Sequence, residues 1–335
     1  MLKTRNRERL AWFAAGCTFA AIALAADEPR QWLQRMNEAL VSRNYDGVFS
    51  HWQGGRVEML RIIHRIQDGE VTERLVSLDG SGREFIRSGA ELTCYLPDQR
   101  TVVVERRSSA KPLIGNFPSF DEASAGVYNV QEVKRTRFNR RDTRVIAVNP
   151  RDDYRYGYRL WIDESSAMPL KTQLCDARGR VMEQVVFASL TLSSRIPNAA
   201  FKPDVATEGF QWLRTEHEAQ TPPALSVAWN AVRLPPGFRM LNRSAQLMPG
   251  ATRPVAHLVF SDGLASVSVF VEIQSAGSEA GAQDSAATRF GTSSAFSTVI
   301  DGHKVTAVGE VPPATVRFIA NSLKAEPVTL QLPAH

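Results

Sequence analysis

A strict alternation of side chains over residues 154–163 constrains the fold of this chain most. The even positions are all aromatic or aliphatic: Tyr154, Tyr156, Tyr158, Leu160 and Ile162. The odd positions are mostly polar and include Arg155, Arg159 and Asp163. A period of two predicts a β-strand with one buried face and one solvent-facing face, and it places Arg155 in water.

Turn signals divide the sequence that follows into further strands. Asp163-Glu-Ser-Ser166 ends the first strand, Pro169 can open the second, and Asp176-Ala-Arg-Gly179 separates the second from the third. We therefore expect a three-stranded antiparallel meander over 154–190. Turns that contain glycine also recur about every ten residues between 48 and 106, which is typical of an antiparallel meander or barrel.

Residues 1–25 have the layout of a signal peptide. Lys3, Arg5, Arg7 and Arg9 precede an apolar run over 10–24, and Ala23-Leu24-Ala25 supplies small residues for cleavage. A lipoprotein signal through Cys17 and an uncleaved anchor are the alternatives. The basic pI comes largely from this leader, because the rest holds 36 Lys and Arg against 34 Asp and Glu. A net charge of +2 does not predict a nucleic-acid partner.

The remaining length suits two domains. We assign residues 26–214 to the first, with an amphipathic helix over 29–43 that Asp27 caps, and residues 215–224, which contain Pro222-Pro223, to a linker. The second domain, residues 225–335, combines an alternating strand over 265–273, a hairpin turning at Asp301-Gly302 and a helix over 313–323. The predicted fold class is therefore α+β, rich in β-strands.

Two sequence features leave alternatives open. Export permits a disulfide between Cys94 and Cys175, but alternation places Cys94 on an apolar face and Cys175 on a polar one, so the alternative is two thiols that stand apart in the sheet. The basic stretch over 134–144 predicts the solvated end of a hairpin, or else a contact with an anion or a lipid headgroup. The irregular stretch over 108–126 is long enough to serve a function.

Motifs of catalysis and metal binding do not emerge from the sequence. It has no Gly-x-Ser-x-Gly elbow, no Walker loop and no His-x-x-x-His pair, and Gly80-Ser-Gly82 lacks the third glycine of a dinucleotide site. His51 and His64 in the first predicted hairpin are interpreted as surface or packed side chains. We therefore expect neither an enzyme nor a bound cofactor.

Several short motifs, in the same order along both domains, resemble the RseB/MucB family. In the first domain they are Tyr158-Arg-Leu-Trp-Ile-Asp163, Met168-Pro-Leu170, Asp176-Ala-Arg-Gly179 and Glu183-Gln184. In the second domain they are Ser261-Asp-Gly-Leu264, Ser266-Val-Ser-Val269 and Val308-Gly-Glu-Val-Pro-Pro-Ala314. Each motif is weak alone, but the series covers nearly the whole chain after the leader.

The resemblance implies a first domain like the lipoprotein-carrier fold, an unclosed antiparallel barrel wrapped on helices around an apolar cavity. It also implies a soluble periplasmic regulator of the envelope-stress sigma factor. Such a protein binds the periplasmic part of a membrane-spanning anti-sigma factor, protects it from proteolysis, and is released by lipid or lipopolysaccharide acyl chains. A periplasmic carrier of lipid or lipoprotein is the alternative, and a homo-oligomer is compatible with the sequence.

Two sets of residues are candidates for these tasks. Tyr156, Tyr158, Leu160 and Ile162 lie on the apolar face of the first predicted strand and are candidates for a lipid cavity, unless they pack on the helix over 29–43. Phe270 is a large aromatic on the otherwise polar face of the strand over 265–273, so it is a candidate anchor for the anti-sigma factor. The alternative is that Phe270 lies under the segment over 276–288.

Overall fold

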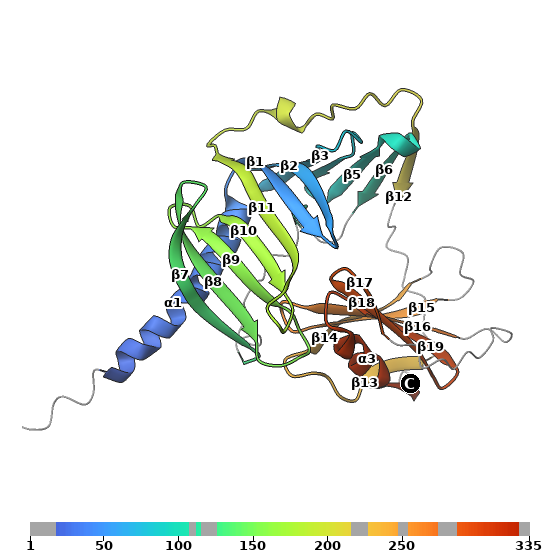
Figure 1. Cartoon of the computed structure of the whole chain (residues 1–335). Coiled ribbons are helices and arrows are strands. Elements are labelled where there is room, and N and C mark those ends of the chain that lie inside the picture. The colour runs from blue at the N-terminus through green and yellow to red at the C-terminus, as the bar shows by residue number, and fades with distance from the viewer. Residues whose placement is uncertain are drawn as a thin grey trace, which may run out of the picture.

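The chain forms two β-rich domains in a computed structural model, which describes residues 18–106, 112–114, 126–215, 227–246, 254–273 and 287–327. A curved sheet of 12 strands builds the first domain, and a six-stranded sheet with a two-stranded ribbon builds the second (Figure 1). The predicted α+β, β-rich class is confirmed. Most of the predicted linker and most of the stretches over 108–126 and 276–288 lie outside the described residues.

The long sheet is open, because its edge strands β12 and β7 lie at opposite ends of the strand order. That order is β12-β6-β5-β4-β3-β2-β1-β11-β10-β9-β8-β7, with antiparallel neighbours except for the parallel pair β12 and β6. The unclosed barrel implied by the resemblance is thus present. Its strands are β1 (Tyr45–Gln53), β2 (Arg56–Gln67), β3 (Glu70–Ser77), β4 (Glu84–Ser88), β5 (Glu91–Leu96), β6 (Thr101–Arg106), β7 (Tyr128–Phe138), β8 (Arg141–Pro150), β9 (Gly157–Asp163), β10 (Pro169–Cys175), β11 (Val181–Leu192) and β12 (Gln211–Thr215).

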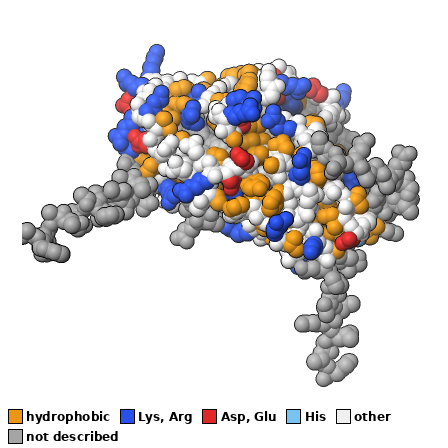
Figure 2. Space-filling view, turned by 60° about the horizontal axis from the view of Figure 1, so that its bottom comes forward, with side chains coloured by type: hydrophobic (Ala, Val, Ile, Leu, Met, Phe, Trp, Pro, Cys, Tyr) orange, Lys and Arg blue, Asp and Glu red, His pale blue; other side chains and the backbone are white. Residues whose placement is uncertain are grey.

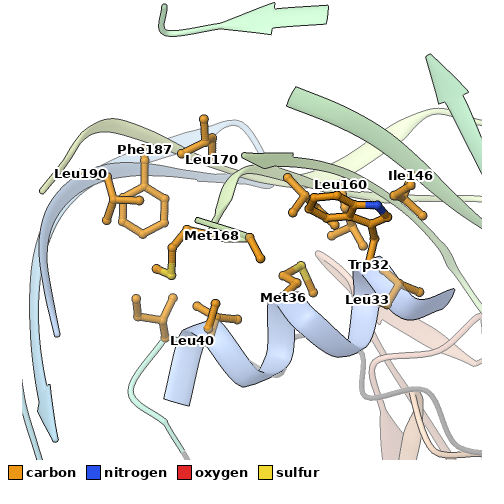
Figure 3. Packing of buried hydrophobic residues seen from close by; sticks show 14 of the residues in the cluster. Trp32, Leu33, Met36, Leu40, Ile146, Leu160, Met168, Leu170, Phe187 and Leu190 are labelled. Atoms are coloured by element: carbon orange, nitrogen blue, oxygen red, sulfur yellow. The ribbon is translucent and has the colours of Figure 1, made fainter. Parts of the chain in front are cut away.

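Helix α1 (Thr18–Ser42) lies on the concave side of this sheet. Trp32, Leu33, Met36 and Leu40 point from the helix into the sheet, where they meet residues such as Leu160 (Figure 3). The helix begins at Thr18 rather than at Pro29 as predicted, because the alanine-rich residues before Pro29 also favour a helix. Within the described residues, no helix has the combination of length and apolar content that a membrane span requires.

The predicted meander is confirmed as β9, β10 and β11, with turns at the two predicted positions. The expectation for Arg155 was wrong. Its side chain is 0% exposed, because residues before Gly157 leave the strand and turn toward the second domain. Cys94 and Cys175 both keep their thiols, and five strands of the sheet separate β5 from β10, so the alternative without a disulfide holds.

The second domain packs the apolar face of its six-stranded sheet on helix α3 (Pro313–Asn321). Val267, Val269 and Val271 of β16 are buried against Val316 and Ile319, as the alternation predicted. The sheet order is β14-β15-β16-β19-β18-β17, beside the ribbon β13-β20. The strands are β13 (Val227–Ala231), β14 (Arg239–Gln246), β15 (Val255–Ser261), β16 (Ser266–Ile273), β17 (Thr288–Phe290), β18 (Ser293–Ile300), β19 (His303–Gly309) and β20 (Leu323–Pro327).

A buried ion pair joins the two domains. Nη1 of Arg155 lies 2.5 Å from Oδ2 of Asp262, and both side chains are 0% exposed. Asp262 also accepts a hydrogen bond from the Tyr128 hydroxyl at 3.0 Å and from the backbone amides of Leu264 and Ala265. Every oxygen of this buried carboxylate therefore has a donor, which offsets the cost of removing it from water.

The guanidinium of Arg155 also has hydrogen-bond acceptors around it. It donates to both carboxylate oxygens of Asp152 at 2.9 Å and to the carbonyl of Pro236 at 2.6 Å. Nearby, the hydroxyl of Thr315 at the start of α3 donates to the carbonyl of Tyr154 at 2.7 Å. Because these contacts come from β7, the turn before β9, the turn after β15 and α3, they fix how the domains meet.

Replacing Asp262 by Asn tests this junction. Asn keeps the shape, and its Oδ1 can still accept the two backbone hydrogen bonds, but its Nδ2 replaces the charged Oδ2 and sets a donor against the guanidinium of Arg155. Because Asp152 still offsets the guanidinium, we expect a loss of about 1.5–3 kcal/mol, the contribution of a hydrogen bond to a charged group. Urea denaturation measures it, with D301N at an exposed turn of the same domain as the control. A loss below about 0.5 kcal/mol in D262N would contradict the role of the pair.

Candidate functional site

A cavity of 310 Å³ lies on the concave face of the first domain. Its size is within the range of about 300–1,000 Å³ that small-molecule sites occupy. Residues of β1, β2, β3, β9, β10 and β11 form most of its wall. The lining residues are Phe49, His51, Leu60, Leu75, Leu113, Ile114, Tyr158, Leu160, Thr172, Gln173, Leu174, Glu183, Gln184, Val185 and Glu310.

Most of the wall is apolar. Phe49 and Leu160 belong both to the wall and to the core that packs on α1, so the cavity continues the space that the helix fills elsewhere. Leu113 and Ile114 contribute from outside the sheet, and the backbone amide of Leu113 donates to Glu73 at 2.9 Å. The cavity is therefore suited to an apolar chain, since burying such a chain removes it from water at the expense of few polar groups.

One end of the cavity is polar and lies against the second domain. Nε2 of His51 lies 2.8 Å from Oε1 of Glu183, and Nε2 of Gln53 donates to the other oxygen of Glu183 at 3.2 Å. The same Gln53 nitrogen lies 2.9 Å from the hydroxyl of Thr292, which donates to Glu310 at 2.5 Å. Thr292 and Glu310 belong to the second domain, so this end of the cavity is built by both.

Carboxylates dominate the electrostatics of the polar end. The hydrogen bond to Glu183 raises the pKa of His51 above its ordinary value, and the charges of Glu183, Glu58 and Glu310 act in the same direction. Withdrawal from water raises the pKa of Glu310, and the nearby charge of Glu183 adds to that effect. Burial also raises the pKa of the Tyr158 hydroxyl, as do Glu310, Glu183 and Asp262. The charge of His51 opposes these shifts by lowering the pKa of Glu310, so charges of both signs meet at this end.

Metal chemistry receives no support from this arrangement. Within the part of the chain that the structure describes, no three His, Cys, Asp or Glu side chains come together as ligands of a metal ion. His51 is engaged by Glu183, and His64 is buried with Nδ1 at 2.8 Å from the carbonyl of Arg43. The polar end is a set of hydrogen-bonding groups around an apolar cavity, which fits a binding protein.

Family models match both domains of the chain. The MucB/RseB N-terminal domain matches residues 28–205, and the MucB/RseB C-terminal domain matches residues 223–324. The chain belongs to the MucB/RseB family. The recognition made from the sequence motifs is thereby confirmed.

Named members of the MucB/RseB family are similar to this chain over nearly its whole length. The sigma factor AlgU regulatory protein MucB of Pseudomonas aeruginosa is 31% identical over 316 residues, which cover 93% of this chain and 95% of that protein. The sigma-E factor regulatory protein RseB of Escherichia coli K12 is 29% identical over 332 residues, covering 93% and 97%. These relatives are regulatory proteins by name.

Solved structures of MucB have the same fold. MucB in complex with MucA(peri) is similar with a TM-score of 0.69 at 28% identity, covering 89% of this chain and 99% of that chain. A structure of MucB by itself gives a TM-score of 0.59 at 28% identity and covers 89% and 98%. The two-domain architecture of this MucB/RseB protein therefore matches that of a relative seen with a partner.

The structure separates the four candidate cavity residues. Tyr158 and Leu160 line the cavity, whereas Ile162 packs in the core around α1. Tyr156 is buried outside the cavity, and this burial raises the pKa of its hydroxyl. The sequence pattern placed the four side chains on one face because it predicted a strand that starts at residue 154. The strand β9 begins only at Gly157.

Phe270 lies on the face of the second sheet away from α3. It is half-buried, and its ring stacks on His257 of the neighbouring strand with centroids 4.5 Å apart and planes 4° from parallel. The segment over 276–288 that was the alternative cover is described only from 287, so it does not decide between the two interpretations.

Sequence analysis missed the polar end of the cavity. His51 was interpreted as a surface or packed side chain, and Glu183 was noted only within a family motif. Continuing the period of two along β11 places Glu183 on the same face as Val185 and Phe187, so a buried-face carboxylate was a detectable signal. Glu310 was not predictable, because it reaches the cavity only through the packing of the two domains.

The contact between His51 and Glu183 leads to a prediction about the titration of the His51 imidazole. Because its pKa is raised above 6.5 in the folded protein, the contact with Glu183 stabilises the fold fully at pH values below 6.5 and loses that effect as the pH rises through the raised pKa. Proton NMR of the imidazole should give a midpoint above 6.5 that moves down in E183Q. His257 on β15 of the second domain is the reference ring, because burial lowers its pKa without a contribution from Glu183. A His51 midpoint that is unchanged in E183Q would contradict the assignment.

Proposed function

We propose that this chain is a periplasmic regulator that binds the periplasmic segment of a membrane-spanning anti-sigma factor and so restrains the envelope-stress sigma factor. The observation that carries the proposal is the similarity to MucB in its complex with MucA(peri), which spans both domains and 99% of that chain. Relatives named as sigma factor regulators at about 30% identity support the same function.

The periplasmic location follows from the leader over residues 1–25. Cleavage near Ala25 removes the first turns of α1 and leaves Pro29 close to the new start of the helix, where proline is well tolerated. Among the residues of α1 whose side chains the structure describes, those in the core begin at Trp32, and these remain after the cleavage. A mature chain that begins at residue 26 keeps both domains.

In the proposed mechanism, bound regulator shields the anti-sigma factor from its first proteolytic cut, and lipid reverses the binding. The cavity supports the lipid step, because it offers an apolar wall large enough for part of an acyl chain. Tyr158 and Leu160 remain the candidates from the original four that would contact such a chain, while Tyr156 and Ile162 would support the wall around it.

The polar end of the cavity, which both domains form, would couple the binding of lipid to the binding of the partner. A ligand that reaches Glu310 contacts the second domain directly, although its chain lies in the first. A change in domain placement on partner binding would rearrange this contact, so a ligand at the junction would favour or oppose that change.

The second domain is proposed to provide much of the binding free energy for the anti-sigma factor. Phe270 is exposed enough to contact a partner, and its stack on His257 holds the ring in place, so little side-chain freedom is lost on binding. On the lower side of the molecule, hydrophobic side chains form a band with Lys and Arg among them (Figure 2). Exposed hydrophobic side chains that lie together often mark a surface that binds another chain.

The central test is binding of the mature full-length protein to the periplasmic segment of a single-pass anti-sigma factor. We expect a specific complex that protects the segment from proteolysis and that fatty acid or lipid A weakens by about tenfold or more. Calorimetry measures both effects. A lipid carrier would instead yield acylated material without retaining the segment, and that outcome would exclude the regulator.

Phe270→Ala should weaken the complex with the anti-sigma segment by about tenfold, or about 1.4 kcal/mol, because it removes the anchoring ring. Phe290→Ala is the matched control, since Phe290 of the edge strand β17 is 67% exposed and its loss should change the affinity little. Point variants are preferable to removing the second domain, which would leave Arg155 without Asp262. Wild-type affinity in F270A would show that the anchor lies elsewhere.

A further inference from the structure

We propose that Glu73 is a positioning residue of the lipid cavity, which holds Leu113 and Ile114 in the cavity wall so that they are in place before an acyl chain binds. This role rests on the lipid binding proposed above, and it belongs to a residue that does not itself line the cavity. We call residues 112–114 the wall segment.

The wall segment is a part of the cavity wall that the long sheet does not build. Leu113 and Ile114 line the cavity, whereas most other lining residues belong to strands. Ile114 is 6% exposed and belongs to the core around α1, and Leu113 packs against that core. Strand residues are held by the hydrogen bonds of the sheet. The wall segment lies outside the strands, so its position depends on contacts of its own.

Glu73 of β3 supplies such a contact. Its Oε2 accepts hydrogen bonds from the backbone amide of Leu113 and from Nε of Arg87, each at 2.9 Å. Glu73 is 0% exposed, so both hydrogen bonds form away from water. A hydrogen bond to an ionised acceptor is about twice as strong as one between neutral groups. The wall segment is therefore fixed to the sheet through the main chain of Leu113.

The strand register places Glu73 beside the cavity. Directly opposed residues of four neighbouring strands form a buried row across the sheet: Tyr45, His64, Glu73 and Arg87. Opposed residues lie on the same face of a sheet. Leu75 lies two positions after Glu73 on the same face of β3, and it lines the cavity. The buried row thus runs next to the apolar wall, and Glu73 connects it to the wall segment.

The hydrogen bonding of Glu73 favours this placement of the wall segment. Within the described residues, Oε1 of Glu73 has no hydrogen-bond partner, and Nε2 of His64 lies 3.8 Å from it. Burial lowers the pKa of His64 below 6.5, so at pH 7 this ring brings no charge to the carboxylate. A buried carboxylate that loses one of few donors is strongly disfavoured. Movement of Leu113 away from Glu73 is therefore opposed.

A wall that is ordered in advance raises the affinity for an acyl chain. A segment that becomes ordered only on binding loses conformational freedom at that step, and the loss reduces the affinity. The hydrogen bond to Glu73 fixes Leu113 in the free protein. Glu73 therefore acts on the ligand through Leu113, for a fatty acid and for the acyl part of a larger lipid alike.

Glu84 of β4 repeats this chemistry away from the cavity. It is 2% exposed, and it accepts hydrogen bonds from Nε of Arg74 and from the backbone amide of Asp204, each at 2.9 Å. Like Glu73, it is a buried carboxylate that pairs with an arginine and holds one amide from outside the strands. Neither Glu84 nor Asp204 lines the cavity. Glu84→Gln is therefore the matched control for Glu73→Gln.

The test measures binding of myristate to the mature full-length protein by calorimetry. Glu73→Gln should weaken binding by about tenfold or more, because Gln keeps the shape but removes the charge that holds the Leu113 amide. Glu84→Gln should destabilise the fold to a similar extent in urea denaturation, yet bind myristate within about twofold of the wild type. Wild-type affinity in E73Q, or an equal loss of affinity in both variants, would overturn the positioning role.

Amide hydrogen exchange of the wild-type protein supplies a second measurement, which does not depend on the folding of E73Q. The amide of Leu113 should be protected from exchange in the free protein, and myristate should slow its exchange further. Exchange of this amide at the rate of an unstructured peptide would contradict the role of Glu73.

The wild-type protein separates this role from the proposed function. If the wild type binds neither myristate nor lipid A, the lipid step and the role of Glu73 fail together. If the wild type binds myristate and E73Q binds it equally well, the role of Glu73 fails and the lipid step stands. Binding of the anti-sigma segment is measured separately, without lipid.

Discussion

The concave face of the long open sheet is the constraint from which the rest of the structure follows. Twelve strands that curve without closing present more apolar surface than one helix can cover. Helix α1 covers one part with Trp32, Leu33, Met36 and Leu40. The part it leaves becomes a cavity, and the second domain closes one end of that cavity through Glu310. The core around α1, the cavity and the contact with the second domain therefore all lie on the concave face of the sheet.

The junction between the domains is polar rather than apolar at its centre. A buried pair such as Arg155 and Asp262 gains little net stability over apolar residues of equal size, because both ions lose their water. It does specify geometry, since each donor and acceptor must meet its partner at one relative placement of the domains. Leu264 packs on the core of the first domain beside this pair, so apolar contact supplies attraction and the ion pair supplies orientation.

Two contacts of different character therefore connect the domains. The Arg155 contact is sealed from water, with full hydrogen bonding around both ions. The contact through Gln53, Thr292 and Glu310 lies at the cavity and is open to a ligand. In the proposed function, the first junction keeps the domains joined and the second responds to lipid. This division gives the proposed function a physical basis in the residues of this chain.

The sequence by itself determined the local structure and the family. The alternation over β9 and β16 predicted which faces are buried, Asp301 and Gly302 predicted a hairpin turn that has positive φ at both residues, and the ordered motifs identified the MucB/RseB family. Tertiary structure decided the rest. Arg155 lies inside because a second domain brings Asp262 to it, and Glu310 lines a cavity of the first domain although it lies 127 positions after Glu183. Period and turn chemistry act over a few residues, whereas these placements depend on which surfaces meet, and a single sequence carries no local signal for that.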